Sequence, residues 1–132
     1  MVKKGMLVAG GILNFLFGVL HVFMARSIHV SKVFTDDTRS LLTAFNSAVT
    51  LVVFYFAYVS LFQSRDLLGT KIGKSTLVLI SVFYLVRAAE EFFLFRFDAL
   101  IFFACILPGG IYAILLFMSD QNASTVDSQT KF

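Results

Sequence analysis

Three ionisable side chains, Arg87, Glu90 and Glu91, lie within an otherwise apolar segment that has the character of a membrane helix. The two carboxylates follow the guanidinium by three and four residues, the spacing at which helical side chains meet. A charge at bilayer depth is costly unless it finds a partner, so this group is a candidate functional site. One arginine cannot neutralise two carboxylates. We therefore expect one carboxylate to be protonated or to contact His21, and the site to respond to pH.

Composition places the chain in a membrane. It is 58% hydrophobic and 14% charged, with a mean hydropathy of +0.87, which is too apolar for a soluble domain of this length. The net charge of +3 suits anionic lipid headgroups but is too small to indicate a nucleic-acid partner.

The single cysteine, Cys105, excludes an intrachain disulfide. Tryptophan is absent, so the candidate interface anchors are the tyrosines Tyr55, Tyr58, Tyr84 and Tyr112.

The sequence predicts an all-α fold, an integral membrane four-helix bundle, because a span needs about 20 apolar residues. The predicted spans cover residues 5–25, 41–63, 75–95 and 99–118, and the polar segment 119–132 is expected to be a disordered tail. The third span includes Arg87, Glu90 and Glu91, and an interfacial third helix is the alternative. The first apolar run is longer than a signal-peptide core, so we expect this helix to be retained.

The distribution of basic residues predicts the orientation. With the N-terminus inside, the inner side carries six basic residues and the outer side four. The inner ones are Lys3, Lys4, Arg65, Lys71, Lys74 and Lys131, and the outer ones are Arg26, Lys32, Arg39 and Arg96. The positive-inside rule therefore predicts a multi-pass protein of the plasma (inner) membrane with both termini cytoplasmic. The bias is modest and leaves insertion in both orientations as an alternative.

This topology brings polar residues of three helices to one depth. At 1.5 Å per residue, His21, Asn46, Glu90 and Glu91 fall roughly 6–8 Å below the outer boundary, and Arg87 about 12 Å below it. We therefore predict one binding site made of these five residues, with Glu91 facing inward and Glu90 peripheral. The alternative is that the polar layer locks the bundle together or reaches the headgroups and binds nothing.

Small and polar residues recur along two helices at spacings of three and four, which is typical of packed membrane helices. In the first helix they are Gly11, Asn14, Gly18, His21 and Ala25, and in the second Thr43, Asn46, Thr50, Val53, Ala57, Ser60 and Ser64. We expect Gly18 to lie in a close contact between helices.

The fourth span contains Pro108, Gly109 and Gly110 at its middle. Proline removes a backbone donor and clashes with the preceding turn, and glycine lowers resistance to bending. These residues are predicted to form a hinge at the floor of an outward-facing pocket. A fixed kink that fits the helix to its neighbours is the alternative.

The leading functional hypothesis is a small membrane protein whose outer-leaflet polar pocket binds or translocates a small polar or protonatable solute. The alternative is a non-catalytic accessory or assembly subunit that binds another membrane protein or a second copy of itself. Catalysis is disfavoured because no nucleophile or oxyanion arrangement is visible. No cofactor is expected, and no metal, since the Glu-x-x-His spacing of di-iron helices is missing.

Overall fold

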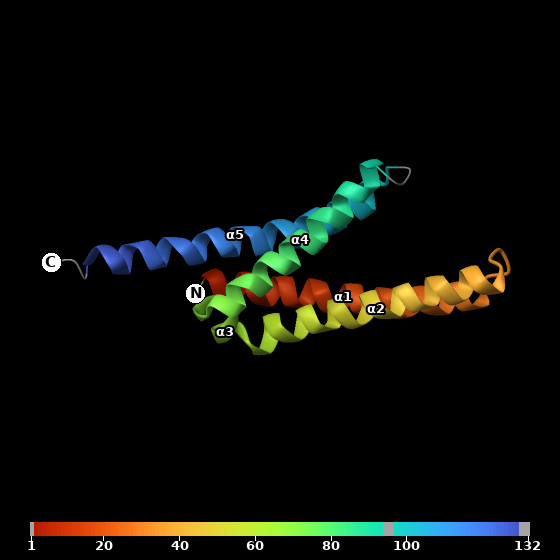
Figure 1. Ribbon diagram of the computed structural model, residues 1–132, viewed down its shortest axis with the longest axis horizontal. Helices are drawn as coiled ribbons and strands as arrows, with labels where there is room; N and C mark the ends of the chain where they lie inside the picture. Colours follow the sequence, from red (N-terminus) through yellow and green to blue (C-terminus); the bar gives the residue numbers. More distant parts are fainter. Residues whose placement is uncertain (1, 94–96, 130–132) are drawn as a thin grey trace.

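The computed structural model describes residues 2–93 and 97–129, and its side chains are described as far as Ser119. Over these residues the chain is helical, which confirms the all-α prediction (Figure 1). The helices are α1 (Val2–Val30), α2 (Asp36–Phe62), the short α3 (Ser64–Gly69), α4 (Lys71–Phe93) and α5 (Ala99–Gln129). Among the described residues four helices are long and apolar enough to cross a membrane, namely α1, α2, α4 and the Ala99–Ser119 part of α5. They indicate a multi-pass membrane protein.

The third predicted span corresponds to α4, which continues without a break through Arg87, Glu90 and Glu91 to Phe93. The last two residues of that predicted span, 94 and 95, lie outside the described residues. The structure therefore places the three charged residues inside a helix of spanning length.

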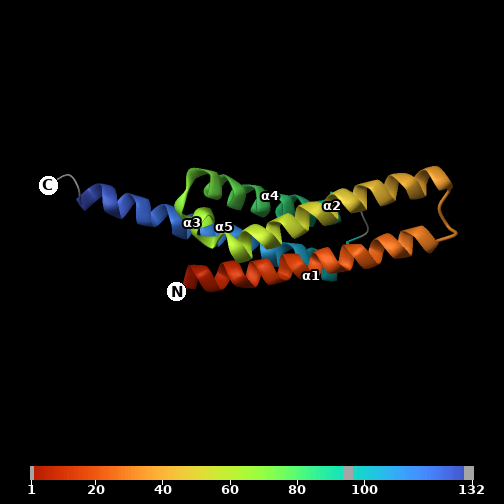
Figure 2. The same ribbon diagram turned by 90° about the horizontal axis from the view of Figure 1, so that it is seen from below.

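Two helical segments differ from the prediction. The helix α3 was not expected, and α5 continues to Gln129 through a segment for which the sequence predicts a disordered tail. Residues 119–129 contain neither proline nor glycine, so an existing helix extends through them without the cost of a new nucleus. In all three ribbon views this part of α5 projects beyond the end of the bundle that carries the N-terminus (Figure 2).

Polar side chains define where the helices begin. Thr35 caps α2 and accepts a hydrogen bond from the Thr38 backbone at 3.4 Å. Asp98 caps α5, its Oδ1 accepting from the backbone nitrogens of Leu100 at 2.9 Å and Ile101 at 3.3 Å. These caps occupy N–H groups that have no partner within the helix.

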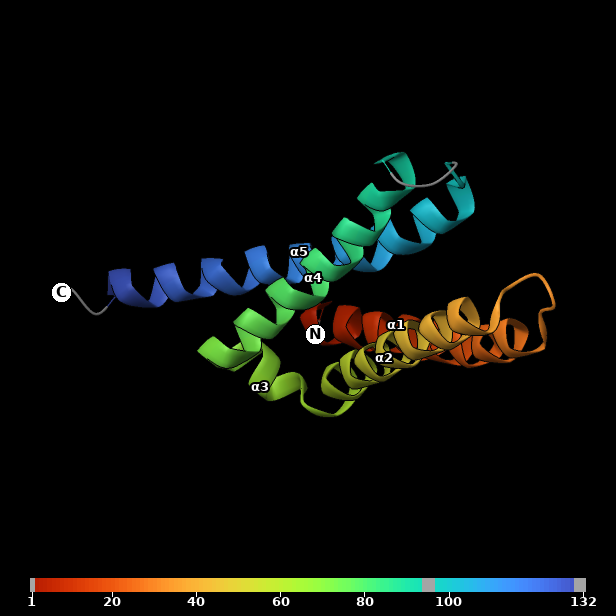
Figure 3. The same cartoon turned by 45° about the vertical axis from the view of Figure 1, so that its right-hand side comes forward.

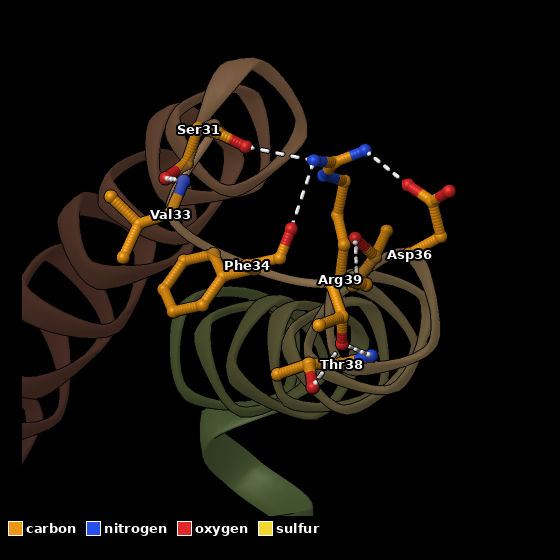
Figure 4. A network of polar contacts seen from close by, with 8 residues as sticks. Ser31, Val33, Phe34, Asp36, Thr38 and Arg39 are labelled. Carbon is orange, nitrogen blue, oxygen red and sulfur yellow. Dashed lines mark hydrogen bonds and ion pairs between the residues drawn. The ribbon is translucent and has the colours of Figure 1, made fainter.

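Arg39 closes the connection between α1 and α2 (Figure 4). Its Nη2 donates to the carbonyl oxygens of Ser31 at 2.9 Å and Phe34 at 3.2 Å, and its Nη1 lies 2.9 Å from Asp36 Oδ1. The guanidinium therefore holds both ends of the loop and the first turn of α2 together. Arg39 is one of the basic residues from which the orientation is predicted, and it therefore also has a structural role.

The long helices form two antiparallel hairpins, α1 with α2 and α4 with α5. Contacts between the hairpins run chiefly between α1 and α5. The hairpins meet near the N-terminus and α3, and their looped ends diverge (Figures 1 and 3). The bundle is therefore closed at one end and splayed at the other.

A polar node joins the two hairpins within the core. It consists of Asn14 of α1, Ser60 of α2, Tyr84 of α4 and Tyr112 of α5, each at most 3% exposed. The Tyr84 hydroxyl donates to Asn14 Oδ1. Asn14 Nδ2 donates to Tyr112 Oη at 2.7 Å and to the Gly10 carbonyl at 2.9 Å, and Tyr112 Oη lies 2.7 Å from Ser60 Oγ. One asparagine thus connects, directly or through Tyr112, to every long helix.

Glycines in α1 allow the close approach that this node requires. A Cβ at Gly10 would lie 2.8 Å from Tyr112 Oη, and one at Gly18 would lie 2.7 Å from the Phe54 ring of α2. The prediction that Gly18 lies in a close interhelical contact is confirmed. The predicted stripes are buried at Gly11, Asn14 and Gly18 in α1 and at Asn46, Val53, Ala57 and Ser60 in α2.

The tyrosines expected at the interface divide into two pairs, and the interface role of Tyr55 and Tyr58 stays a prediction. Tyr55 and Tyr58 are exposed, whereas Tyr84 and Tyr112 lie in the core. The correction has a physical reason, because a phenol with a hydrogen-bond partner inside the bundle does not need to reach the membrane surface.

Removing the Tyr84 hydroxyl should weaken the contact between the hairpins. Tyr84→Phe leaves Asn14 Oδ1 without its donor, and we expect a loss of about 1 kcal/mol of unfolding free energy in detergent, within the range for membrane hydrogen bonds. Tyr55→Phe removes the same group from an exposed ring and should change stability by less than half as much. Equal losses in the two variants would contradict a buried node.

Candidate functional site

The structure sorts the five predicted site residues into two groups. Arg87, Glu90 and Glu91, here called the α4 cluster, are joined by ion pairs on one helix. His21 and Asn46 lie on the other hairpin and are connected to each other through the α1 backbone. Among the described residues no hydrogen bond or ion pair links the two groups. The prediction grouped the five residues because they lie at a similar depth along their helices. The two hairpins diverge toward their looped ends, where these residues lie (Figure 3).

Within the α4 cluster the two carboxylates are unequal. Glu91 Oε1 lies 2.6 Å from Arg87 Nη1, and the Glu91 side chain is 2% exposed. Glu90 Oε2 lies 3.7 Å from the same nitrogen, and its side chain is 36% exposed, as is that of Arg87. Successive helical residues point about 100° apart, so only one carboxylate can face inward. The prediction that Glu91 is inward and Glu90 peripheral is confirmed.

Glu91 is buried because it continues the face of α4 that packs in the core. Tyr84, Ala88 and Glu91 share this face, and Ala88 is 1% exposed. Cys105 of α5 is also buried and lies within electrostatic range of the whole α4 cluster. The carboxylate of Glu91 is thus removed from lipid and water, and the Arg87 guanidinium supplies its compensating charge.

The Asn46 side chain joins α2 to α1, whereas the His21 side chain bonds within its own helix. His21 Nδ1 donates to the Phe17 carbonyl at 2.8 Å, which requires the proton to be on that nitrogen. Asn46 Nδ2 donates to the His21 carbonyl at 2.8 Å, and Asn46 is 8% exposed. These contacts assign the pair a structural position, and a part in binding stays a prediction.

The Pro108 region is packed in the described structure. Pro108 is buried, α5 remains helical through it, and α5 changes direction along its length (Figure 3). The Gly109 carbonyl accepts a hydrogen bond from Ser81 Oγ at 3.0 Å, and a Cβ at Gly109 would lie 3.2 Å from Leu85. Gly110 has open space around it. These contacts correspond to the fixed-kink alternative, and hinge motion stays a prediction.

The polar node is the feature that sequence reasoning missed. Asn14 was assigned to a packing stripe, but its partners Tyr84 and Tyr112 were assigned to the membrane surface. A detectable signal was present, because a mid-span tyrosine must place its hydroxyl on an acceptor and few acceptors occur at that depth. Among the side chains that the structure describes, in residues 2–93 and 97–119, no group of three or more His, Cys, Asp and Glu could hold a metal ion.

The geometry of the α4 cluster predicts a coupled effect of mutation. Arg87→Leu leaves the buried Glu91 carboxylate without its guanidinium and should cost about 1–3 kcal/mol of unfolding free energy, less than a fully buried pair because Arg87 is partly exposed. Adding Glu91→Gln should restore part of that loss. Glu90→Gln is the matched carboxylate control and should have a smaller effect. Additive losses in a double-mutant cycle measured in detergent would contradict the pairing.

No protein-family model matches the chain, and no curated protein or solved structure matches it. The geometry of the α4 cluster and of the polar node is therefore the basis for a functional assignment.

Proposed function

We propose that this chain is a non-catalytic membrane subunit that docks on another membrane-embedded chain through the outer part of α4. One observation carries the proposal. The buried polar side chains Asn14, Asn46, Ser60 and Glu91 are paired within the chain, whereas Arg87 and Glu90 keep more than a third of their side-chain surface exposed. The exposed charge is the part of the polar layer that the fold itself does not enclose.

Five of the exposed or partly exposed residues of α4 form one continuous face. Leu79, Val82, Val86, Glu90 and Phe93 follow one another at spacings of three and four, and we call this face the α4 stripe. Its apolar members are each about half exposed or more. The stripe is apolar except for Glu90, so it offers a membrane partner a packing surface with a single acidic contact.

The charge balance indicates the chemistry of the partner. Arg87 lies 2.6 Å from Glu91 and 3.7 Å from Glu90, so its guanidinium is committed mainly to the buried carboxylate. Among the described residues Glu90 is therefore the carboxylate held less closely by a cation, and it brings a negative charge to the stripe. A partner helix with a basic or hydroxyl side chain at this depth would satisfy it, and polar contacts between membrane helices have this form.

We also propose that the termini face the cytoplasm. Lys3 and Lys4 lie in the first turn of α1, and at the same end of the bundle Arg65 lies in α3 and Lys71 begins α4 (Figure 1). This concentration of basic residues supports an inner location for the closed end. The splayed end and the α4 cluster would then lie in the outer leaflet.

Cysteine labelling tests the orientation. In a Cys105→Ala background, a membrane-impermeant maleimide should label Val30→Cys in intact cells and Gly69→Cys only after lysis. Gly69 is a suitable position because a Cβ there would meet no atom within 4 Å. Labelling of both positions from one side would contradict the four-span topology, and equal mixed labelling of each would indicate insertion in both orientations.

Photocrosslinking tests the docking proposal. A benzophenone amino acid at Val86 of the α4 stripe should give a discrete crosslinked protein band in membranes. The same residue at Leu51, which is 72% exposed on α2, is the control and should crosslink only lipid. Glu90→Leu should abolish the Val86 band. A band of twice the chain's mass would identify the partner as a second copy, and lipid adducts alone at Val86 would refute docking.

The second candidate is binding of a protonatable or cationic solute by the α4 cluster. The excess of two carboxylates over one guanidinium favours it, because a proton or a small organic cation would also restore neutrality. In that case Glu90→Gln would abolish solute binding by purified protein while the Val86 crosslink to another chain would be absent.

A further inference from the structure

We propose that a depression at the closed end of the bundle binds the phosphate-bearing headgroup of an anionic phospholipid. The depression has a volume of about 510 Å³ and is lined by Lys4, Phe62, Ser64, Arg65, Leu68 and Gly69. It combines the first turn of α1 with the junction of α2 and α3. Its volume lies within the roughly 300–1,000 Å³ typical of small-molecule sites.

Lys4 and Arg65 bring two positive charges to the depression. Both are exposed, and neither forms an ion pair with any residue that the structure describes. Other cations of this chain are already engaged: Lys3 Nζ donates to the Met118 carbonyl at 2.7 Å, and Arg39 holds the α1–α2 loop. The charges of Lys4 and Arg65 remain available to an anion, and Ser64 lines the same depression with a hydroxyl donor.

The remaining wall of the depression is apolar. Phe62, the last residue of α2, is 76% exposed, and Leu68 of α3 is partly buried beside it. This boundary coincides with the ends of two apolar helices of spanning length. A lipid whose phosphate lies between Lys4 and Arg65 can therefore extend an acyl chain along Phe62 toward the hydrocarbon region.

The position of the depression favours a lipid over a soluble phosphate. Basic side chains at a membrane surface are attracted to anionic headgroups, each by an energy that corresponds to about fivefold in affinity. An inorganic phosphate would use the two cations but not the apolar wall. The two sources of phosphate are therefore distinguishable in one experiment.

The test measures thermal unfolding of the full chain in a neutral detergent as lipid is added. Dioleoylphosphatidylglycerol should raise the unfolding temperature of the wild type in a saturable manner, because ligand that binds only the folded state stabilises it. Dioleoylphosphatidylcholine should not. The variant Lys4→Gln/Arg65→Gln should shift the half-saturating phosphatidylglycerol concentration upward by about 10- to 30-fold.

The matched control is Arg26→Gln/Lys32→Gln, which removes one exposed arginine and one exposed lysine at the other end of the bundle and should keep the wild-type concentration dependence. If Lys4→Gln/Arg65→Gln is less stable before lipid is added, the single variant Lys4→Gln replaces it, with an expected shift of about fivefold. Equal shifts in test and control variants, or equal stabilisation by phosphatidylcholine, would overturn the proposal. Stabilisation by inorganic phosphate alone to the same extent would overturn the assignment to a lipid.

Discussion

The fold depends on the hydrogen bonding of one asparagine. Asn14 lies at the centre of α1, is fully buried, and contacts phenols from both α4 and α5. In a membrane the hydrophobic effect does not drive helices together, so packing and polar contacts of this kind decide which helices associate. Without the node, each hairpin would still pair its own two helices. The contact between hairpins would then depend on apolar packing, such as Phe56 against Phe83, and on the Lys3–Met118 hydrogen bond.

Because polar contacts between helices need the helices to be close together, the polar residues have different roles at the two ends of the bundle. Where the hairpins meet, polar side chains find partners across helices and become structural. Where the hairpins diverge, α4 must satisfy its own charges, and Arg87 and Glu91 form a pair within one helix. Glu90 lies farther from the Arg87 guanidinium, at 3.7 Å, and its side chain stays partly exposed on the surface of α4. A splayed bundle thus produces one exposed acidic position in an apolar face, and this position is the basis of the docking proposal.

The closed end of the bundle is basic, whereas the splayed end carries charges of both signs. The closed end gathers basic side chains around α3, where Gly73 allows the α3 backbone to lie directly against α4: a Cβ at that position would be 2.0 Å from the Asp66 carbonyl oxygen. The splayed end carries the surplus carboxylate of the α4 cluster. The basic end is the part proposed to face anionic headgroups, and Glu90 is the part proposed to meet another membrane chain.

The sequence by itself determined the four long apolar helices, the membrane class and the inward position of Glu91, because hydropathy and the helical repeat act within one segment. It also identified Gly18 as a packing position from local spacing. Only the tertiary structure decided that Asn14 meets Tyr84 and Tyr112, and that His21 lies apart from Arg87. These outcomes depend on how the hairpins cross and diverge. That geometry arises from contacts between residues 70 and 98 positions apart in the chain, which no periodicity within a helix encodes.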